Sequence, residues 1–202
     1  MTKIKICGIM RDCDCGFLNE ALPDYAGFIF VEGRRRCISP ETAAGFREKL
    51  DRRIKTVGVF LDDDIERIVK IAGMGIIDMV QLHGRETDEY IAEVKERTGL
   101  PVMKAFTVRG IIDVNTALHS AADMLLMDNG AGTGEMFDHE LIEEADRFFF
   151  LAGGLDPDNV GAAVERYCPY GVDVSTGVET DGQKDRDKIM RFIEAVRKAD
   201  TF

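Results

Sequence analysis

The chain has 202 residues, with 26 Lys and Arg against 37 Asp and Glu, so its formal net charge is −11. This length suits one domain or at most two small ones, and 45% apolar with 31% charged residues is typical of a globular protein. An acidic chain without a basic tail is a poor nucleic-acid binder, because that affinity comes largely from neutralising phosphates. No apolar run approaches the roughly 18 residues that a membrane span needs, and the N-terminal apolar stretch is too short for a signal peptide.

Eight short apolar runs, each followed by a stretch of helical character, organise the chain. We predict strands at 4–7, 26–30, 56–60, 79–82, 102–106, 124–127, 149–152 and 171–174. Their starts lie 22 to 30 residues apart, which fits one strand, one loop and one helix in each unit.

The helices between the strands have readable faces and ends. Apolar residues follow the i, i+3, i+4, i+7 spacing at 65–72, 160–167 and 189–196. Ser39-Pro40 and Asp156-Pro157 each place a capping residue before a proline, which predicts that a helix begins there. Gly99 predicts the end of the helix before the fifth strand.

Eight β/α units without a linker predict an α/β protein, a (β/α)₈ TIM barrel that takes residues 1–202 as one compact domain with short loops. The alternative is a doubly wound open sheet, which commonly uses five or six strands. Eight strands at near-even spacing favour the barrel.

In a TIM barrel, the chemistry lies at the C-terminal ends of the strands. This sequence places polar residues and glycines at those ends repeatedly: Cys7, Arg36, Gln81, His83, Asp128, Gly153, Gly154, Asp173, Ser175, Thr176 and Gly177. We therefore expect them to share one face of the molecule.

Glycines after the seventh and eighth strands indicate a phosphate site. Gly153-Gly154 and Ser175–Gly177 stand where backbone N–H groups and a helix N-terminus receive a phosphate in this fold. The alternative is that these glycines only form tight turns. Gly130–Gly134 resembles a phosphate cradle, but it lacks the Lys-Ser/Thr ending of a P-loop, so we predict a flexible loop over the site.

Several other residues of this face admit two interpretations. Arg34–Arg36 is either a solvated loop or a loop in which one guanidinium clamps a carboxylate. Cys7 is either a small buried side chain or a catalytic thiolate. Asp128 is either a helix cap or a carboxylate at the barrel mouth, and His83 is either structural or a ligand of the substrate.

Alternation along the first and last strands makes a prediction about the barrel interior. Lys5 lies on the same side of its strand as Cys7, and Asp173 on the same side as Ser175. These two strands become neighbours when the barrel closes. An isolated buried charge is very costly, so we expect Lys5 and Asp173 to pair inside the barrel, with Lys104 as a candidate third member of the network.

Ten segments between residues 5 and 185 carry a family resemblance: Lys5–Gly8, Arg36–Pro40, Val57–Phe60, Val80–Gly84, Leu126–Asp128, Gly132–Gly134 with Phe137-Asp138, Ala152–Leu155, Asn159-Val160, Val172–Glu179 and Lys184-Asp185. In this order they resemble phosphoribosylanthranilate isomerase of tryptophan biosynthesis.

The resemblance implies an Amadori rearrangement of N-(5-phosphoribosyl)anthranilate, in which Asp128 is the general acid and Cys7 the general base. It implies that Arg36 holds the anthranilate carboxylate and that Gly154 and Ser175–Gly177 hold the phosphate. We predict that the rest of the face also binds substrate, namely Gln81, His83, Gly153 and Asp173. The implied partner is this phosphorylated small molecule, with no cofactor, metal, nucleic acid or membrane, in a monomer or homodimer.

The sequence departs from the family at Glu135, where a lysine is usual, and at His139, after a short loop that follows Asp128. A rival enzyme reading is another sugar-phosphate isomerase, which would replace the Cys7/Asp128 pair by two carboxylates or a catalytic lysine.

The five cysteines, Cys7, Cys13, Cys15, Cys37 and Cys168, are an odd number without CxxC spacing. This pattern indicates neither a disulfide framework nor a zinc site, and we expect a cytoplasmic protein. A different class of function is a metal- or ligand-binding protein that uses Cys7, Cys13, Cys15 and His83; a metal assay on the pure protein separates it from an enzyme.

Overall fold

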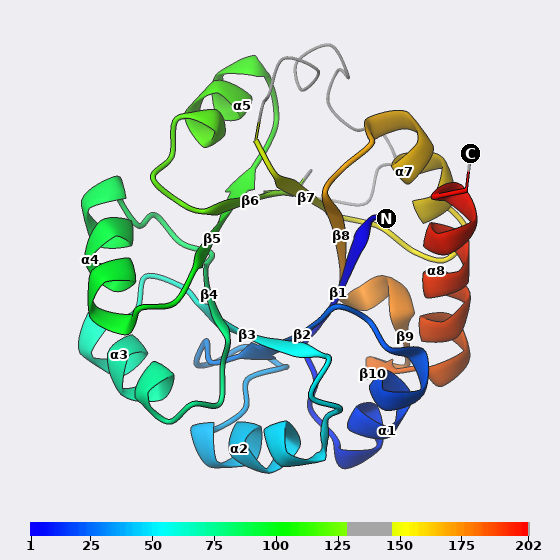
Figure 1. The fold of residues 1–202 in the computed structure, drawn as a ribbon, viewed down its shortest axis with the longest axis horizontal. Helices are drawn as coiled ribbons and strands as arrows, with labels where there is room; N and C mark the ends of the chain where they lie inside the picture. The colour runs from blue at the N-terminus through cyan, green and yellow to red at the C-terminus, as the bar shows by residue number, and fades with distance from the viewer. Residues whose placement is uncertain (129–146, 202) are drawn as a thin grey trace.

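Eight parallel strands close into a barrel in the computed structural model, which describes residues 1–128 and 147–201 (Figure 1). The strands follow chain order around the ring, and β8 returns to β1. They are β1 (Lys3–Cys7), β2 (Tyr25–Ile29), β3 (Lys55–Phe60), β4 (Met79–Leu82), β5 (Val102–Thr107), β6 (Met124–Asp128), β7 (Phe149–Ala152) and β8 (Gly171–Val174). The predicted TIM barrel is confirmed, and the open-sheet alternative is wrong.

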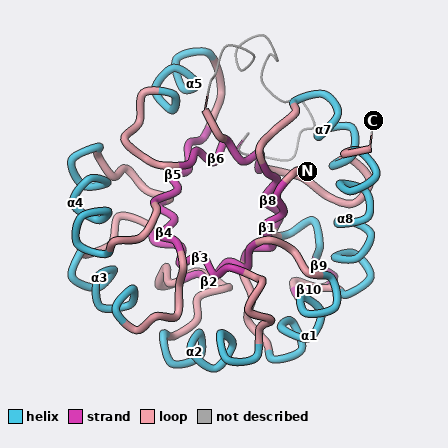
Figure 2. The backbone as a smooth tube through the Cα atoms, viewed as in Figure 1, coloured by secondary structure: helices cyan, strands magenta, loops and turns pink. Residues whose placement is uncertain are grey.

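Helices surround the ring of strands (Figure 2). They are α1 (Asp12–Ala21), α2 (Pro40–Lys49), α3 (Ile65–Gly73), α4 (Asp88–Thr98), α5 (Ile111–Leu118), α7 (Val160–Tyr167) and α8 (Arg186–Ala199). No helix within 1–128 and 147–201 is long and apolar enough to cross a membrane. The loop expected at Gly130–Gly134, with Glu135 and His139, lies outside the described residues.

Two of the predicted helix ends are confirmed by their caps. The Ser39 hydroxyl accepts a hydrogen bond from the Thr42 N–H group at 3.2 Å, and Pro40 is the first residue of α2. At the end of α4, Gly99 adopts the left-handed conformation with φ of 68°, which favours glycine.

The start predicted at Asp156-Pro157 is wrong by three residues, because α7 begins at Val160. The Asp156 carboxylate accepts hydrogen bonds from the N–H groups of Asp158 and Asn159, at 2.8 and 3.0 Å. It therefore caps a tight turn that precedes the helix. The proline pattern correctly marked a turn of helical backbone but not the element that follows it.

The barrel interior is apolar toward the N-terminal ends of the strands and polar toward their C-terminal ends. The apolar part comprises Tyr25, Val57, Met79, Met103, Ala105, Leu126 and Phe150, and the cluster continues to Ala152 at the C-terminal end of β7. Gly171 makes room for the ring of Phe150, since a Cβ at this position would lie 2.4 Å from it. Large side chains thus close one end of the barrel and leave space at the other.

Lys5 and Asp173 lie side by side on the paired strands β1 and β8, as the alternation predicts. The Lys5 ammonium is fully buried and lies 2.8 Å from Asp173 Oδ1. Burial by itself would lower the pKa of Lys5, but the negative charge of Asp173 and the neighbouring Cys7 outweigh it, so the pKa is raised and the charged form is retained. The expected ion pair inside the barrel is confirmed.

Lys104 does not join this pair. It alternates with Met103 and Ala105, which line the interior, so its side chain leaves β5 on the opposite side. There its ammonium lies 3.1 Å from Glu86 and donates to the Gly84 carbonyl at 2.7 Å. The expectation of a three-membered network was wrong, because it overlooked the alternation along β5.

Replacement of Lys5 by Met should reduce the free energy of unfolding by about 3–5 kcal/mol, because Asp173 then stays buried without its partner. The double variant Lys5→Met/Asp173→Asn should recover much of that loss. Lys3→Met is the matched control, because Lys3 also ends in an ion pair, with Asp24, but is 40% exposed; it should cost at most about 1 kcal/mol. Urea unfolding measures all three, and equal losses for Lys5→Met and Lys3→Met would contradict the buried role.

Candidate active site

A cavity of about 480 Å³ opens at the C-terminal ends of the strands. It brings together every residue that the sequence predicted for the site except Gly177: Cys7, Arg36, Gln81, His83, Asp128, Gly153, Gly154, Asp173, Ser175 and Thr176. Residues from six of the eight β/α units therefore meet in one place, which is the geometry expected of a TIM-barrel active site.

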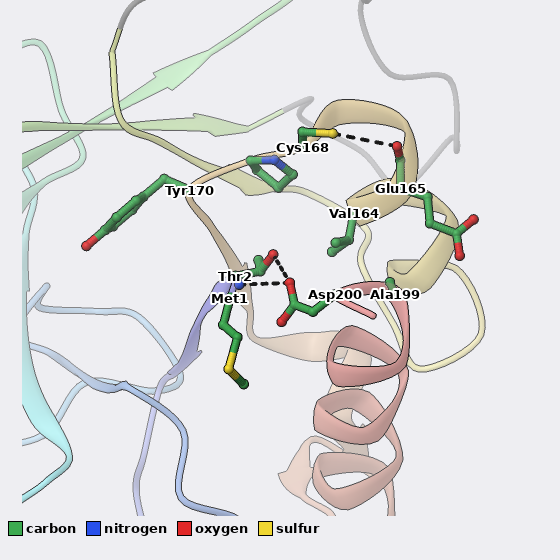
Figure 3. A pocket seen from close by; sticks show the side chains of 9 residues that line it. Met1, Thr2, Val164, Glu165, Cys168, Tyr170, Ala199 and Asp200 are labelled. Carbon is green, nitrogen blue, oxygen red and sulfur yellow. Dashed lines mark hydrogen bonds between the residues drawn. The ribbon is translucent and has the colours of Figure 1, made fainter. Parts of the chain in front are cut away.

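A larger cavity, of about 700 Å³, lies at the opposite end of the barrel (Figure 3). None of the predicted site residues lines it. Its Asp200 carboxylate accepts hydrogen bonds from the Thr2 N–H and hydroxyl groups at 2.9 and 2.7 Å, so it joins the two ends of the chain. Size alone therefore does not identify the chemical site here.

Cys7 ends β1 and points into the mouth cavity, where the residue is only 6% exposed. Opposite it on β2 lies Gly27, whose missing side chain makes this position possible: a Cβ there would lie 2.8 Å from the Cys7 sulfur. The thiol is thus held between two strands with one open direction, toward the cavity.

Burial raises the pKa of the Cys7 thiol above its usual value. The ammonium of Lys5 lowers this pKa, the carboxylate of Asp173 raises it, and the ammonium of Lys184 lowers it again, but burial prevails. The group is therefore a thiol at neutral pH, and a strong base once deprotonated.

Gln81 and His83 extend from β4 into the same cavity. Gln81 is buried, and its Oε1 has no hydrogen-bond partner among the residues that the structure describes. Its Nε2 lies 3.4 Å from His83 Nδ1. His83 stands at the rim with part of its surface exposed, but burial of the ring lowers its pKa more than Asp128 raises it, so the neutral form prevails near pH 7.

Asp128 is the last residue of β6 and faces the cavity across from Cys7, its strand pairing with β7 at Ala152. It is partly buried. The carboxylate thus lies at the barrel mouth, as the second of the two interpretations expects.

Arg36 lines the cavity and is held by Glu179. Its Nε and Nη2 donate to the two carboxylate oxygens at 2.7 and 3.0 Å, a bidentate pair. Within the described residues, Arg36 Nη1 makes no hydrogen bond. The guanidinium is therefore fixed along one edge, with one nitrogen available at the cavity.

The loops after β7 and β8 are pressed together behind the cavity. Gly153 and Gly154 adopt positive φ, of 91° and 62°. A Cβ at Gly177 would lie 1.9 Å from the carbonyl oxygen of Leu155, so only glycine permits this contact between the two loops. Gly177 therefore shapes the site from behind, although it does not line the cavity.

The residues considered for metal binding do not come together. Cys13 and Cys15 lie on α1, one exposed and one buried, whereas Cys7 and His83 lie in the cavity. Across the part of the chain that the structure describes, no group of three or more His, Cys, Asp or Glu side chains is arranged to hold a metal ion.

Comparison with known proteins agrees with this geometry. The family model of N-(5'-phosphoribosyl)anthranilate (PRA) isomerase matches residues 4–195. The chain belongs to this family. The N-(5'-phosphoribosyl)anthranilate isomerase of Endomicrobium trichonymphae is 46% identical, and the match covers 98% of this chain and 99% of that protein.

Solved structures of the family superpose on the whole barrel. Phosphoribosyl anthranilate isomerase from Thermotoga maritima gives a TM-score of 0.88 at 36% identity, covering 98% of this chain and 100% of that one. A phosphoribosyl anthranilate isomerase in complex with reduced 1-(o-carboxyphenylamino)-1-deoxyribulose 5-phosphate gives 0.86, with the same identity and coverage. The chain is thus an enzyme of tryptophan biosynthesis, an isomerase that carries out an Amadori rearrangement.

Sequence reasoning missed two residues of this PRA isomerase site, Glu179 and Lys184. Both belong to a small antiparallel ribbon after β8, formed by β9 (Glu179–Thr180) and β10 (Gln183–Lys184). Both stand inside the segments that resemble the family, which was the available signal. Their roles were not visible because Glu179 meets Arg36, and Lys184 meets Glu179, only through the path that the ribbon takes in three dimensions.

Gly177→Ala should separate the two loops and weaken anion binding, because the added Cβ cannot coexist with the Leu155 carbonyl oxygen. We expect the inhibition constant of inorganic phosphate to rise at least about tenfold, the value of one hydrogen bond to a charged group. Gly45→Ala is the control: it lies in α2 with nothing within 4 Å of the added Cβ, and should leave inhibition unchanged. Unchanged inhibition in Gly177→Ala would show that the close contact does not shape the anion site.

Proposed function

We propose that Asp128 and Cys7 are the acid and base of this isomerase. Asp128 donates a proton to the ring oxygen of N-(5-phosphoribosyl)anthranilate; the C1′–O bond breaks, and the nitrogen lone pair forms a C=N bond. The Cys7 thiolate then removes the C2′ proton, and the electrons of that bond form C1′=C2′ while the C=N pair returns to nitrogen. The resulting enol becomes the ketone of the product, 1-(2-carboxyphenylamino)-1-deoxyribulose 5-phosphate, so the reaction balances as an isomerisation.

The position of Cys7 between the Ser175 loop and Arg36 is the observation that carries this proposal. Its carbonyl oxygen accepts a hydrogen bond from the Ser175 hydroxyl at 3.0 Å, in the proposed phosphate loop. The next residue, Gly8, lies against Arg36, where a Cβ would come within 2.4 Å of Cδ. A substrate with a phosphate at one end and a carboxylate at the other would therefore lie across the thiol.

The remaining polar residues suit the rest of this substrate. We propose that Arg36 binds the anthranilate carboxylate through its available Nη1, and that the loops of Gly154 and Ser175 bind the phosphate through N–H groups. The buried Oε1 of Gln81 would accept a hydrogen bond from a substrate hydroxyl, because an unpaired buried carbonyl is costly until a donor arrives.

We also propose that the chain acts as a single barrel domain in the cytoplasm. The strands between residues 3 and 174 form one ring, and α8 packs against both α1 and α7 (Figure 1). All five cysteines are free thiols, which is typical of proteins in a reducing compartment. Either a monomer or a homodimer is compatible with this proposal.

Cys7→Ala should lower turnover at least about 10²-fold, since a positioned base contributes at least that much. Binding of reduced 1-(o-carboxyphenylamino)-1-deoxyribulose 5-phosphate, measured by titration calorimetry, should be retained, because the anion sites use other residues. Asp128→Asn should also remove most of the turnover, because ring opening loses its proton donor. The fluorescence of the anthranilate moiety follows the reaction.

The other four cysteines are internal controls, since Cys13, Cys15, Cys37 and Cys168 all lie outside the mouth cavity. Their replacement by Ser or Ala should leave the rate within a few fold. Near-normal turnover in Cys7→Ala would contradict the mechanism while leaving the fold and family intact.

Arg36→Ala should raise KM for phosphoribosylanthranilate at least about tenfold, because a charge-assisted contact to the carboxylate is lost. Arg34→Ala is the matched control: Arg34 stands in the same loop but is exposed, and should change KM less than about threefold. Steady-state kinetics compare the two. Equal losses would indicate a diffuse electrostatic effect rather than a specific contact.

A further inference from the structure

The ammonium of Lys184 is buried in the ribbon of β9 and β10, beside the loop that follows β8. Its side chain is fully buried, and it donates to the Ser175 carbonyl at 2.8 Å and to Glu179 Oε1 at 2.9 Å. A buried ammonium is costly unless its hydrogen bonds are satisfied. Here one acceptor, Ser175, lines the cavity, and the other, Glu179, contacts Arg36, which also lines it.

On one side, Lys184 supports the loop after β8. Ser175 is held by two bonds, because its hydroxyl donates to the Cys7 carbonyl and its own carbonyl accepts from Lys184. The N–H groups of the following residues lead into the turn Thr176–Val178, where the phosphate is proposed to bind. Without the ammonium, the Ser175 carbonyl loses the bond that sets the direction of this turn.

On the other side, Lys184 acts on Arg36 through Glu179. This carboxylate accepts from Arg36, Lys184 and Arg35, the last at 2.6 Å. Burial alone would raise the pKa of Glu179, but hydrogen bonds from Arg36 and Lys184 hold it at about 2. The carboxylate is therefore always charged, and it would cancel the charge of Arg36 if the other two cations were absent.

We infer that Lys184 is a positioning residue that sets both anion-binding ends of the active site with one buried ammonium. It fixes the Ser175 loop directly and orients Arg36 through Glu179. This inference rests on the proposed function, because it assumes that these two elements bind the phosphate and the carboxylate. It also implies that the ribbon β9–β10 contributes to substrate binding by positioning the residues that contact the substrate.

Lys184→Met tests the inference, with Arg35→Met as the matched control. Both substitutions take one cation from Glu179, but Arg35 is half exposed and does not contact Ser175. We expect Lys184→Met to raise both KM and the inhibition constant of inorganic phosphate at least about tenfold. Arg35→Met should change either value less than about threefold. A loss of affinity in Arg35→Met equal to that in Lys184→Met would overturn the inference.

The pH dependence of kcat/KM is a second test, because a purely structural role of Lys184 would leave it unchanged. Cys7 faces Lys5 on its own strand, Asp173 on β8 and Lys184 on β10, and the Lys184 ammonium lowers the pKa of the thiol. Because the base acts when deprotonated, kcat/KM rises with pH, and loss of this cation should move the rise to higher pH. Lys184→Gln keeps a donor for Ser175 but loses the charge, so it should restore phosphate inhibition in part while its profile stays shifted. A profile for Lys184→Met that coincides with that of the parent would overturn the inference.

A folding defect is separated by the double variant Lys184→Met/Glu179→Gln, which neutralises the carboxylate together with its buried ammonium partner, so Glu179 is not left charged without Lys184. It should fold with a circular dichroism spectrum like that of the parent and still show weaker phosphate inhibition. Parental inhibition in the folded double variant would overturn the role of Lys184 alone. Absence of any competition by phosphate in the parent enzyme would instead contradict the proposed anion site and, with it, this inference.

Discussion

The ion pair between Lys5 and Asp173 lies where the last strand of the barrel meets the first, and the organisation of the active site depends on it. A lysine inside a closed barrel is tolerated only beside a carboxylate, so β1 and β8 must pair in the one register that sets these two residues side by side. That register also places Cys7, at the end of β1, next to Ser175, the first residue after β8. The charge requirement and the catalytic geometry are therefore met by the same alignment.

The ion pair of Lys5 and Asp173 also affects the pKa of Cys7 at the barrel mouth. Burial favours the neutral thiol of Cys7, and the nearby cations reduce that penalty without removing it. A base of this kind is weakly populated as thiolate at neutral pH but strong when formed, which suits removal of a carbon-bound proton. Asp173 limits how far Lys5 can favour the thiolate, because it neutralises the ammonium at 2.8 Å. The pKa of Cys7 is thus raised chiefly by burial and then adjusted by the two opposed charges of Lys5 and Asp173.

The strands and the faces of their residues could be predicted, because they follow from the periodicity and spacing of the sequence. Contacts that depend on the path of a loop in three dimensions could not. Strand positions and the inward side of Lys5 follow from alternation, because a residue's face in a strand is decided locally. The same rule, applied to β5, would have placed Lys104 outside, with Glu86. The bidentate contact of Glu179 with Arg36 joins residues 143 positions apart in the chain, through a ribbon whose path has no periodic signature. Of the candidate site, the cavity-lining residues were therefore predictable and their supports were not.

The net charge of −11 does not prevent this chain from acting on an anionic substrate. Charges are screened beyond about 10 Å at 0.1 M salt, so the field at the cavity comes from its own walls. Arg36 lines that wall, and behind it Arg35, Arg36 and Lys184 surround the single carboxylate of Glu179, which leaves the cluster positively charged. Glu179 neutralises one positive charge while it orients Arg36. The cluster therefore needs further cations if it is also to attract the carboxylate of the substrate. Glu179 thus orients Arg36, and the buried ammonium of Lys184 offsets the negative charge that Glu179 brings, so that Arg36 can still attract the substrate.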